Sequence, residues 1–82
     1  MSAKNKLEEL LMNAVLNIGA RRVQYLQAIR QYLQKTDPAV LNDELSQITN
    51  IQELRMLLAA GVPSSIMTRF YVQYNKALHE AA

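Results

Sequence analysis

Residues 5–34, which decide the fold, read NKLEELLMNAVLNIGARRVQYLQAIRQYLQ. Apolar residues recur in this stretch at intervals of three and four, the spacing that places side chains on one face of an α-helix. Asn5, followed by Glu8 three residues later, is typical of a helix N-terminus. The apolar face keeps its phase across Gly19, so the pattern favours one continuous helix. A break at Gly19 is the alternative, because glycine costs about 1 kcal/mol relative to alanine inside a helix.

Three shorter helices are indicated after this stretch. Asp37 before Pro38 is a favourable start for a helix, and Pro63 begins another. Gly61 stands where a left-handed residue would close the helix between them. The predicted helices span residues 5–34, 38–48, 50–60 and 63–79. We therefore expect a single all-α domain over residues 1–82. It is a bundle of four helices, or five if the first breaks at Gly19, with a long N-terminal amphipathic helix and a C-terminal helical hairpin.

The composition restricts the classes of function. The chain has 82 residues, half of them hydrophobic, with a net charge of +2, one His and no Cys. This length is too short for most enzyme folds, and the absence of Cys excludes disulfides and Cys-based zinc sites. His79 lies close to the last residue, and the acidic pairs Glu8-Glu9 and Asp43-Glu44 have no His or Cys at ligand spacing, so we expect both pairs on solvated faces. We expect no catalytic residue, cofactor, metal or small-molecule ligand.

The N-terminal sequence has no signal-peptide pattern, because acidic residues stand where an apolar core would begin. The most apolar stretch, residues 10–20, contains Asn13 and Asn17. It is also far shorter than the roughly 18 to 20 apolar residues that a transmembrane helix needs. We therefore expect a cytoplasmic protein that does not contact a membrane.

The length of the first predicted helix indicates self-association. A continuous helix over residues 5–34 would be about 45 Å long, whereas a compact domain of this size is roughly 30 Å across. Either the helix folds back at Gly19, or a second copy of the chain covers the overhang. Met12, Leu16 and Val23 form a second apolar stripe outside the main face. We expect a homodimer that packs through this stripe, with a monomeric five-helix bundle as the alternative.

Positive charge is concentrated in the first part of the chain. Residues 1–36 carry six Lys and Arg against two Glu, a net charge of +4. Arg21, Arg22 and Arg30 are therefore candidates for contact with an acidic protein surface or with nucleic acid. On a continuous helix, Arg22 would lie inside the apolar face and either reach to the surface or meet an acidic residue such as Asp43 or Glu44. A break in the helix would instead let it face water.

Residues 54–70 read LRMLLAAGVPSSIMTRF and resemble the helix-turn-helix of many bacterial and phage DNA-binding proteins. Gly61 matches the glycine that this family has in its turn. Three apolar residues match positions that follow the turn, namely Val62, Met67 and Phe70. The sequence departs from the family at Leu57, where a small residue is usual, and at Ile66, which would point toward DNA although it belongs to an apolar helix face.

The resemblance implies a recognition helix that begins at Pro63. The side chains that it would direct toward the major groove are Ser64, Ser65, Thr68, Arg69 and Gln73, with Arg69 the best candidate for a base or phosphate contact. Residues 37–82 carry three Lys and Arg against five Asp and Glu, a net charge of −2, which opposes DNA binding. We therefore expect a non-enzymatic regulator, inhibitor or assembly factor that acts by protein–protein contact and self-associates. A DNA-binding regulator that uses residues 53–73 is the alternative.

Overall fold

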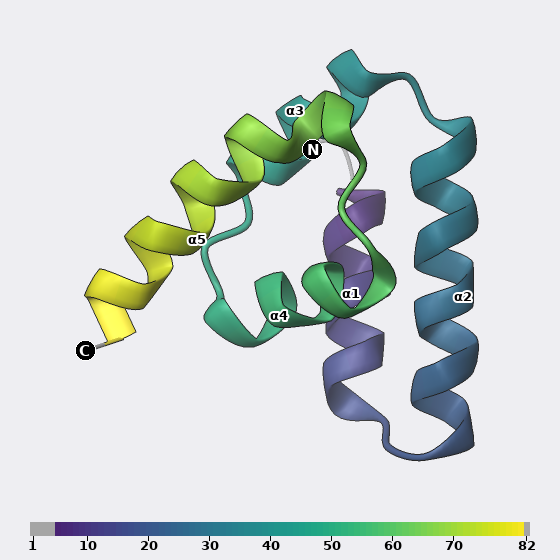
Figure 1. Cartoon of the computed structure of the whole chain (residues 1–82). Helices are drawn as coiled ribbons and strands as arrows, with labels where there is room; N and C mark the ends of the chain where they lie inside the picture. Colours follow the sequence, from purple (N-terminus) through teal and green to yellow (C-terminus); the bar gives the residue numbers. More distant parts are fainter. Residues whose placement is uncertain (1–4, 82) are drawn as a thin grey trace.

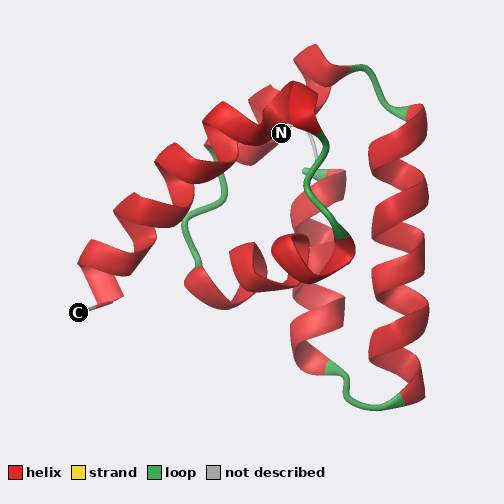
Figure 2. Cartoon of the chain, in the orientation of Figure 1, coloured by secondary structure: helices red, strands yellow, loops and turns green. Residues whose placement is uncertain are grey.

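The computed structural model describes residues 5–81, and over that range it contains five α-helices and one short 3₁₀-helix (Figures 1 and 2). The elements are α1 (Lys6–Leu16), α2 (Ala20–Lys35), α3 (Pro38–Ser46), α4 (Ile51–Ala60), η1 (Ser64–Ile66) and α5 (Met67–Ala81). The predicted all-α class is confirmed. The Cα radius of gyration is 12.0 Å and the principal extents are 32 × 31 × 30 Å. Residues 1–4 and 82 of the predicted domain lie outside the described residues.

The first predicted helix is two helices. α1 ends at Leu16, and the chain turns through residues 17–19 and runs back as α2 beside α1 (Figure 1). Gly19 has φ 65° and ψ −137°, a conformation that is essentially restricted to glycine. The prediction of one continuous helix over residues 5–34 is therefore wrong, and the five-helix alternative is correct. The expected overhang does not exist, so the length argument for a second copy no longer applies.

The helix ends follow the local sequence signals. The side-chain oxygens of Asn5, Asp37 and Asn50 each accept a hydrogen bond from a backbone N–H two or three residues later, at 2.8 to 3.2 Å. Such N-caps satisfy donors that the first turn of a helix leaves free. Gly61 ends α4 with φ 103°, as expected for a C-terminal cap residue. The last helix begins with the 3₁₀ turn η1 after Pro63, so the continuous helix predicted over 63–79 starts more tightly wound than expected.

One hydrophobic core joins all the helices. α4 packs against both α1 and α2, while α5 packs against α3 and α4. The buried apolar side chains are Leu7, Leu11, Ala14, Ile29, Leu33, Leu41, Leu45, Ile48, Leu54, Leu57, Ala60, Ile66, Phe70 and Ala77. The ring of Phe70 stacks on Tyr74, with centroids 5.5 Å apart. No described helix is long and apolar enough to cross a membrane.

Candidate functional site

Arg22 holds the turn between α1 and α2. Its Nε donates hydrogen bonds to the carbonyl oxygens of Ala14 (2.9 Å) and Asn17 (2.8 Å), and its Nη2 donates to that of Val15 (3.3 Å). Ala14 and Val15 lie in the last turn of α1, where carbonyl groups have no partner within the helix. Arg22 therefore caps α1 with a positive charge, which also suits the negative end of the helix dipole. It neither meets Glu44 nor turns freely to water, so both expectations for this residue are corrected.

Large apolar side chains are exposed around this turn. Leu16 is 73% exposed and Ile18 is 79% exposed, the highest values among the exposed large hydrophobic residues of the described range. Val23, in the first turn of α2, is also exposed, and we call Leu16, Ile18 and Val23 the hairpin tip. Met12 is exposed one helical turn before Leu16. The turn lies at the far end of the α1–α2 hairpin, away from α3 and α5 (Figure 1).

The exposure of the hairpin-tip residues follows from where α1 ends. Met12, Leu16 and Val23, the predicted self-association residues, are all exposed. Ile18 continues the helical spacing of the buried residues of α1, but α1 ends two residues before it. Its exposure follows from the break, and helical spacing alone does not reveal it.

The three arginines predicted as partner contacts, all on α2, have different surroundings. Arg22 caps α1, as described above. Arg30 donates from Nε to the carbonyl oxygen of Ala60 at 3.0 Å and so caps the C-terminus of α4. Arg21 is exposed and makes no hydrogen bond or ion pair with another described side chain. Of the three, Arg21 is the one whose guanidinium is fully available to a partner.

A second cluster of predicted residues lies between α3 and α5. Ser65, Thr68 and Arg69 line a hollow of about 370 Å³ together with Asn42 of α3 and Val72 of α5. Ser64 is exposed and directly precedes Ser65. Asn42 has no signal in the sequence, because it reaches this hollow only through the packing of α3 on η1 and α5.

Gln73 does not belong to this exposed cluster. The resemblance to a helix-turn-helix implied that it would face DNA, but the side chain is buried. Its Nε2 donates to the carbonyl oxygens of Ser46 (3.2 Å) and Ile48 (2.8 Å). Gln73 therefore ties α5 to the connection between α3 and α4, and the implied role is wrong. Ile66, by contrast, is buried, as its apolar helix face predicted.

Glu44 is buried, which corrects the expectation of a solvated acidic pair. Its carboxylate accepts hydrogen bonds from the Tyr32 hydroxyl at 2.7 Å and from the Lys6 backbone N–H at 3.0 Å. The second bond satisfies a free donor at the start of α1. Burial, together with the adjacent Glu44 carboxylate, raises the pKa of Tyr32 to about 12.

Glu53 is the second buried carboxylate. Its Oε1 is buried and accepts no hydrogen bond within the described structure. Burial in the core, followed by the negative charge of Glu8 on α1, raises the pKa of Glu53 to about 7. The Glu53 backbone N–H donates to the Asn50 cap of α4, while the Glu53 side chain turns inward to the core. Two carboxyl groups therefore share one poorly solvated site between α1 and α4.

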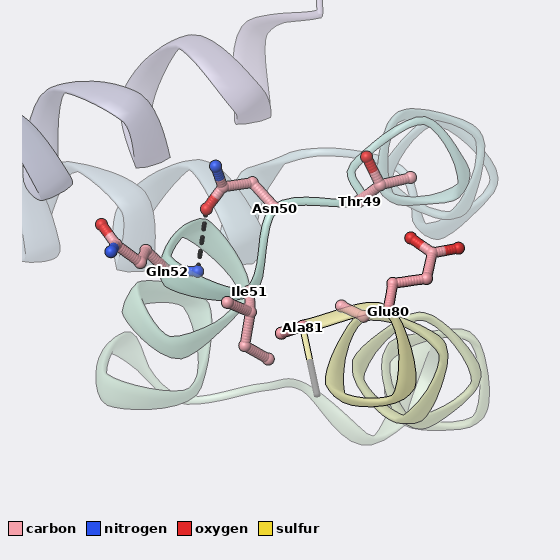
Figure 3. Close-up of a pocket in the computed structure, with 7 residues that line it drawn as sticks. Thr49, Asn50, Ile51, Gln52, Glu80 and Ala81 are labelled. Atoms are coloured by element: carbon pink, nitrogen blue, oxygen red, sulfur yellow. Dashed lines mark hydrogen bonds between the residues drawn. The ribbon is translucent and has the colours of Figure 1, made fainter.

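A further hollow lies between the start of α4 and the last turns of α5 (Figure 3). The side-chain oxygen of Asn50 points at the N–H of Gln52 and is used as the helix cap. Glu80 is the one titratable side chain among the residues that line this hollow. A single carboxylate offers no acid–base pair, so we assign this hollow no chemistry.

Over residues 5–81, no group of three or more His, Asp or Glu could hold a metal ion. The two features that gather predicted contact residues are the hairpin tip and the hollow between α3 and α5. No protein-family model, curated protein or solved structure matches the chain, so these two surfaces carry the functional argument by themselves.

Proposed function

We propose that the protein is a non-catalytic binding module that docks its hairpin tip onto another protein. The observation that carries the proposal is the exposure of Leu16 and Ile18 on a turn that Arg22 holds in place. Covering apolar surface contributes about 25 cal/mol per Å², and a preformed turn loses little conformational entropy on binding. A regulator, inhibitor or assembly factor that covers a partner's surface would use such a feature.

The charge around the tip indicates the kind of partner. Residues 10–36 contain four Lys and Arg and no Asp or Glu, and Arg21 is exposed beside the tip. Two copies that met tip to tip would bring like charges together, which disfavours the contact. An apolar surface with acidic residues at its edge is complementary to the tip. Self-association through Met12, Leu16 and Val23 is the competing use of the same surface.

The decisive experiment compares two double variants. L16S/I18S makes the tip polar, whereas V40S/L58S changes side chains that are 48% and 49% exposed elsewhere on the molecule. Light scattering gives the mass of each variant, and affinity capture from the native source with mass spectrometry gives the retained proteins. We expect the unmodified protein to be a monomer that retains another protein. We expect L16S/I18S to lose this retained protein and V40S/L58S to keep it. If the protein is instead a dimer that L16S/I18S alone converts to a monomer, a second copy of the chain covers the tip. Equal behaviour of both variants would refute docking at the tip.

The hollow between α3 and α5 favours a second candidate function, a DNA-binding regulator. Guanidinium, hydroxyl and amide groups, here from Arg69, Ser65, Thr68 and Asn42, are the groups that contact phosphates and base edges. No acidic residue lines this hollow. Under this proposal, Arg69→Ala weakens salt-sensitive retention on duplex DNA. The absence of a mobility shift with any duplex at low salt would remove this candidate.

A further inference from the structure

A hollow of about 240 Å³ lies where α1, α2 and α4 meet. Five side chains line it: Val15 of α1, Arg22 of α2, and Gln52, Arg55 and Met56 of α4. Val15 directly precedes Leu16, and Arg22 directly precedes Val23, so the hollow adjoins the hairpin tip. A protein that covers the tip and extends toward α4 would reach the hollow as well.

The positive charges of the hollow are available to a ligand. Arg22 is fixed by its three hydrogen bonds to the carbonyl groups of residues 14, 15 and 17, which use the Nε–H and one Nη2–H. An arginine has five N–H donors, so the side chain still offers N–H groups of known position. Arg55 is exposed, and neither arginine forms an ion pair with an acidic side chain of the described range. Glu53 follows Gln52 in the chain, but it faces the core and does not line the hollow.

The apolar part of the hollow narrows the chemistry of the ligand. Val15 and Met56 are partly buried and supply an apolar wall beside the two guanidinium groups. No aromatic side chain lines the hollow, so it offers no platform for stacking a nucleic-acid base. A carboxylate with an apolar group next to it matches both parts, because guanidinium binds carboxylate through paired hydrogen bonds.

We infer that this hollow is a carboxylate subsite of the docking surface. It receives an Asp or Glu side chain of the partner protein between Arg22 and Arg55, and the neighbouring apolar residue of the partner packs on Val15 and Met56. The inference rests on the proposed function, because it places the partner on the hairpin tip. It adds the position of the acidic group and the two cations that recognise it.

Three dipeptides test the subsite without the partner. N-acetyl-glutamyl-leucinamide carries the side-chain carboxylate and the apolar group, N-acetyl-glutaminyl-leucinamide lacks the charge, and N-acetyl-glutaminyl-leucine carries its charge only at the C-terminus. We expect the first to shift the NMR signals of the Arg22 and Arg55 side chains with millimolar affinity. We expect the neutral dipeptide to bind about tenfold more weakly. Equal binding of the first two would overturn the inference, and tightest binding of the third would assign the hollow to a chain terminus instead.

Variants separate the subsite from the rest of the surface. Arg55→Gln removes one cation from an exposed position, and we expect it to weaken the glutamyl dipeptide about tenfold. Lys76→Gln is the control, because Lys76 is an exposed cation on α5 that does not line the hollow. A partner that requires Leu16 and Ile18 but binds Arg55→Gln normally would overturn the subsite and leave the proposed function standing. If the glutamyl dipeptide binds but L16S/I18S still binds the partner normally, the hollow remains a carboxylate site and the proposed function is refuted.

Discussion

The Nε of Arg22 lies 2.9 Å from the carbonyl oxygen of Ala14 and joins the first turn of α2 to the last turn of α1. Ala14 is completely buried, so its carbonyl has little access to water that could replace the guanidinium. The side chain therefore both closes the α1–α2 hairpin and fixes a positive charge at the hairpin tip. This one contact links the stability of the hairpin to the surface that we propose for docking.

Replacement of Arg22 by alanine is predicted to destabilise the fold. The variant leaves the carbonyls of Ala14 and Val15 without their donor, which costs about 2 kcal/mol for a bond to a charged group. Arg21→Ala is the matched control, because Arg21 is exposed and unpaired, and we expect a change below about 0.5 kcal/mol. Urea unfolding followed by circular dichroism measures both values. Equal effects of the two substitutions would contradict the capping role.

Gly19→Ala is predicted to destabilise through the backbone alone. Nothing lies within 4 Å of a Cβ placed at Gly19, so the added methyl group meets no neighbour. The cost of about 1 to 3 kcal/mol comes from the positive φ. D-alanine prefers the mirror images of the backbone conformations that L-residues adopt, and these include positive φ. A synthetic chain with D-alanine at position 19 therefore retains the stability of the natural chain or exceeds it. A D-alanine chain as unstable as the L-alanine chain would refute the backbone explanation.

The stability of the protein is predicted to depend on pH through Glu53. The pKa of this carboxyl rises from 4.5 in the unfolded chain to about 7 in the fold, so the folded state binds a proton that the unfolded state has released. The stabilisation of the fold by this bound proton is complete below pH 4.5 and is lost as the pH rises through 7. It amounts to at most about 3 kcal/mol.

Glu53→Gln tests this dependence. Glutamine keeps the shape of the side chain and removes its ionisation. We therefore expect the free energy of unfolding to vary less with pH between pH 4.5 and 7. Glu80→Gln is the control, because Glu80 is exposed. Denaturant midpoints measured across this range give the result. A slope that survives Glu53→Gln would assign the pH dependence to another group.

Gln73→Leu is predicted to cost about 1 to 3 kcal/mol, because it leaves two carbonyl oxygens without their donor. The loss should be accompanied by faster amide hydrogen exchange around the α3–α4 connection, where Ser46 and Ile48 accept those bonds. Asn75→Leu, at an exposed position of the same helix, is the control. Unchanged exchange in the connection would show that Gln73 does not secure it.

The sequence predicts helices and their ends better than it predicts the break between α1 and α2. The caps at Asn5, Asp37 and Asn50 depend on a few adjacent residues, and all three form. The break at Gly19 depends on tertiary contacts, because the apolar phase continues across it and the cap that supports it comes from Arg22. Local periodicity could not separate these two outcomes.

The candidate surfaces also combine features that the local sequence predicts with features that depend on the packing of distant helices. Ser65, Thr68 and Arg69 share a face by helical spacing, and the structure places them at one hollow. Asn42 arrives from another helix and has no local signal. The burial of Gln73 was recognisable, since it lies three residues after Phe70 and four before Ala77, on the buried stripe of α5.

The amide of Gln73 also sets an order on how the fold is completed during synthesis. Ser46 and Ile48 leave the ribosome at least 25 residues before Gln73, and their carbonyl groups remain hydrated until it follows. The corner between α3 and α4 can therefore become fully bonded only after about the first half of α5, up to Gln73, has emerged. A nascent chain stopped before residue 73 would lack both of the hydrogen bonds that Gln73 donates to this corner.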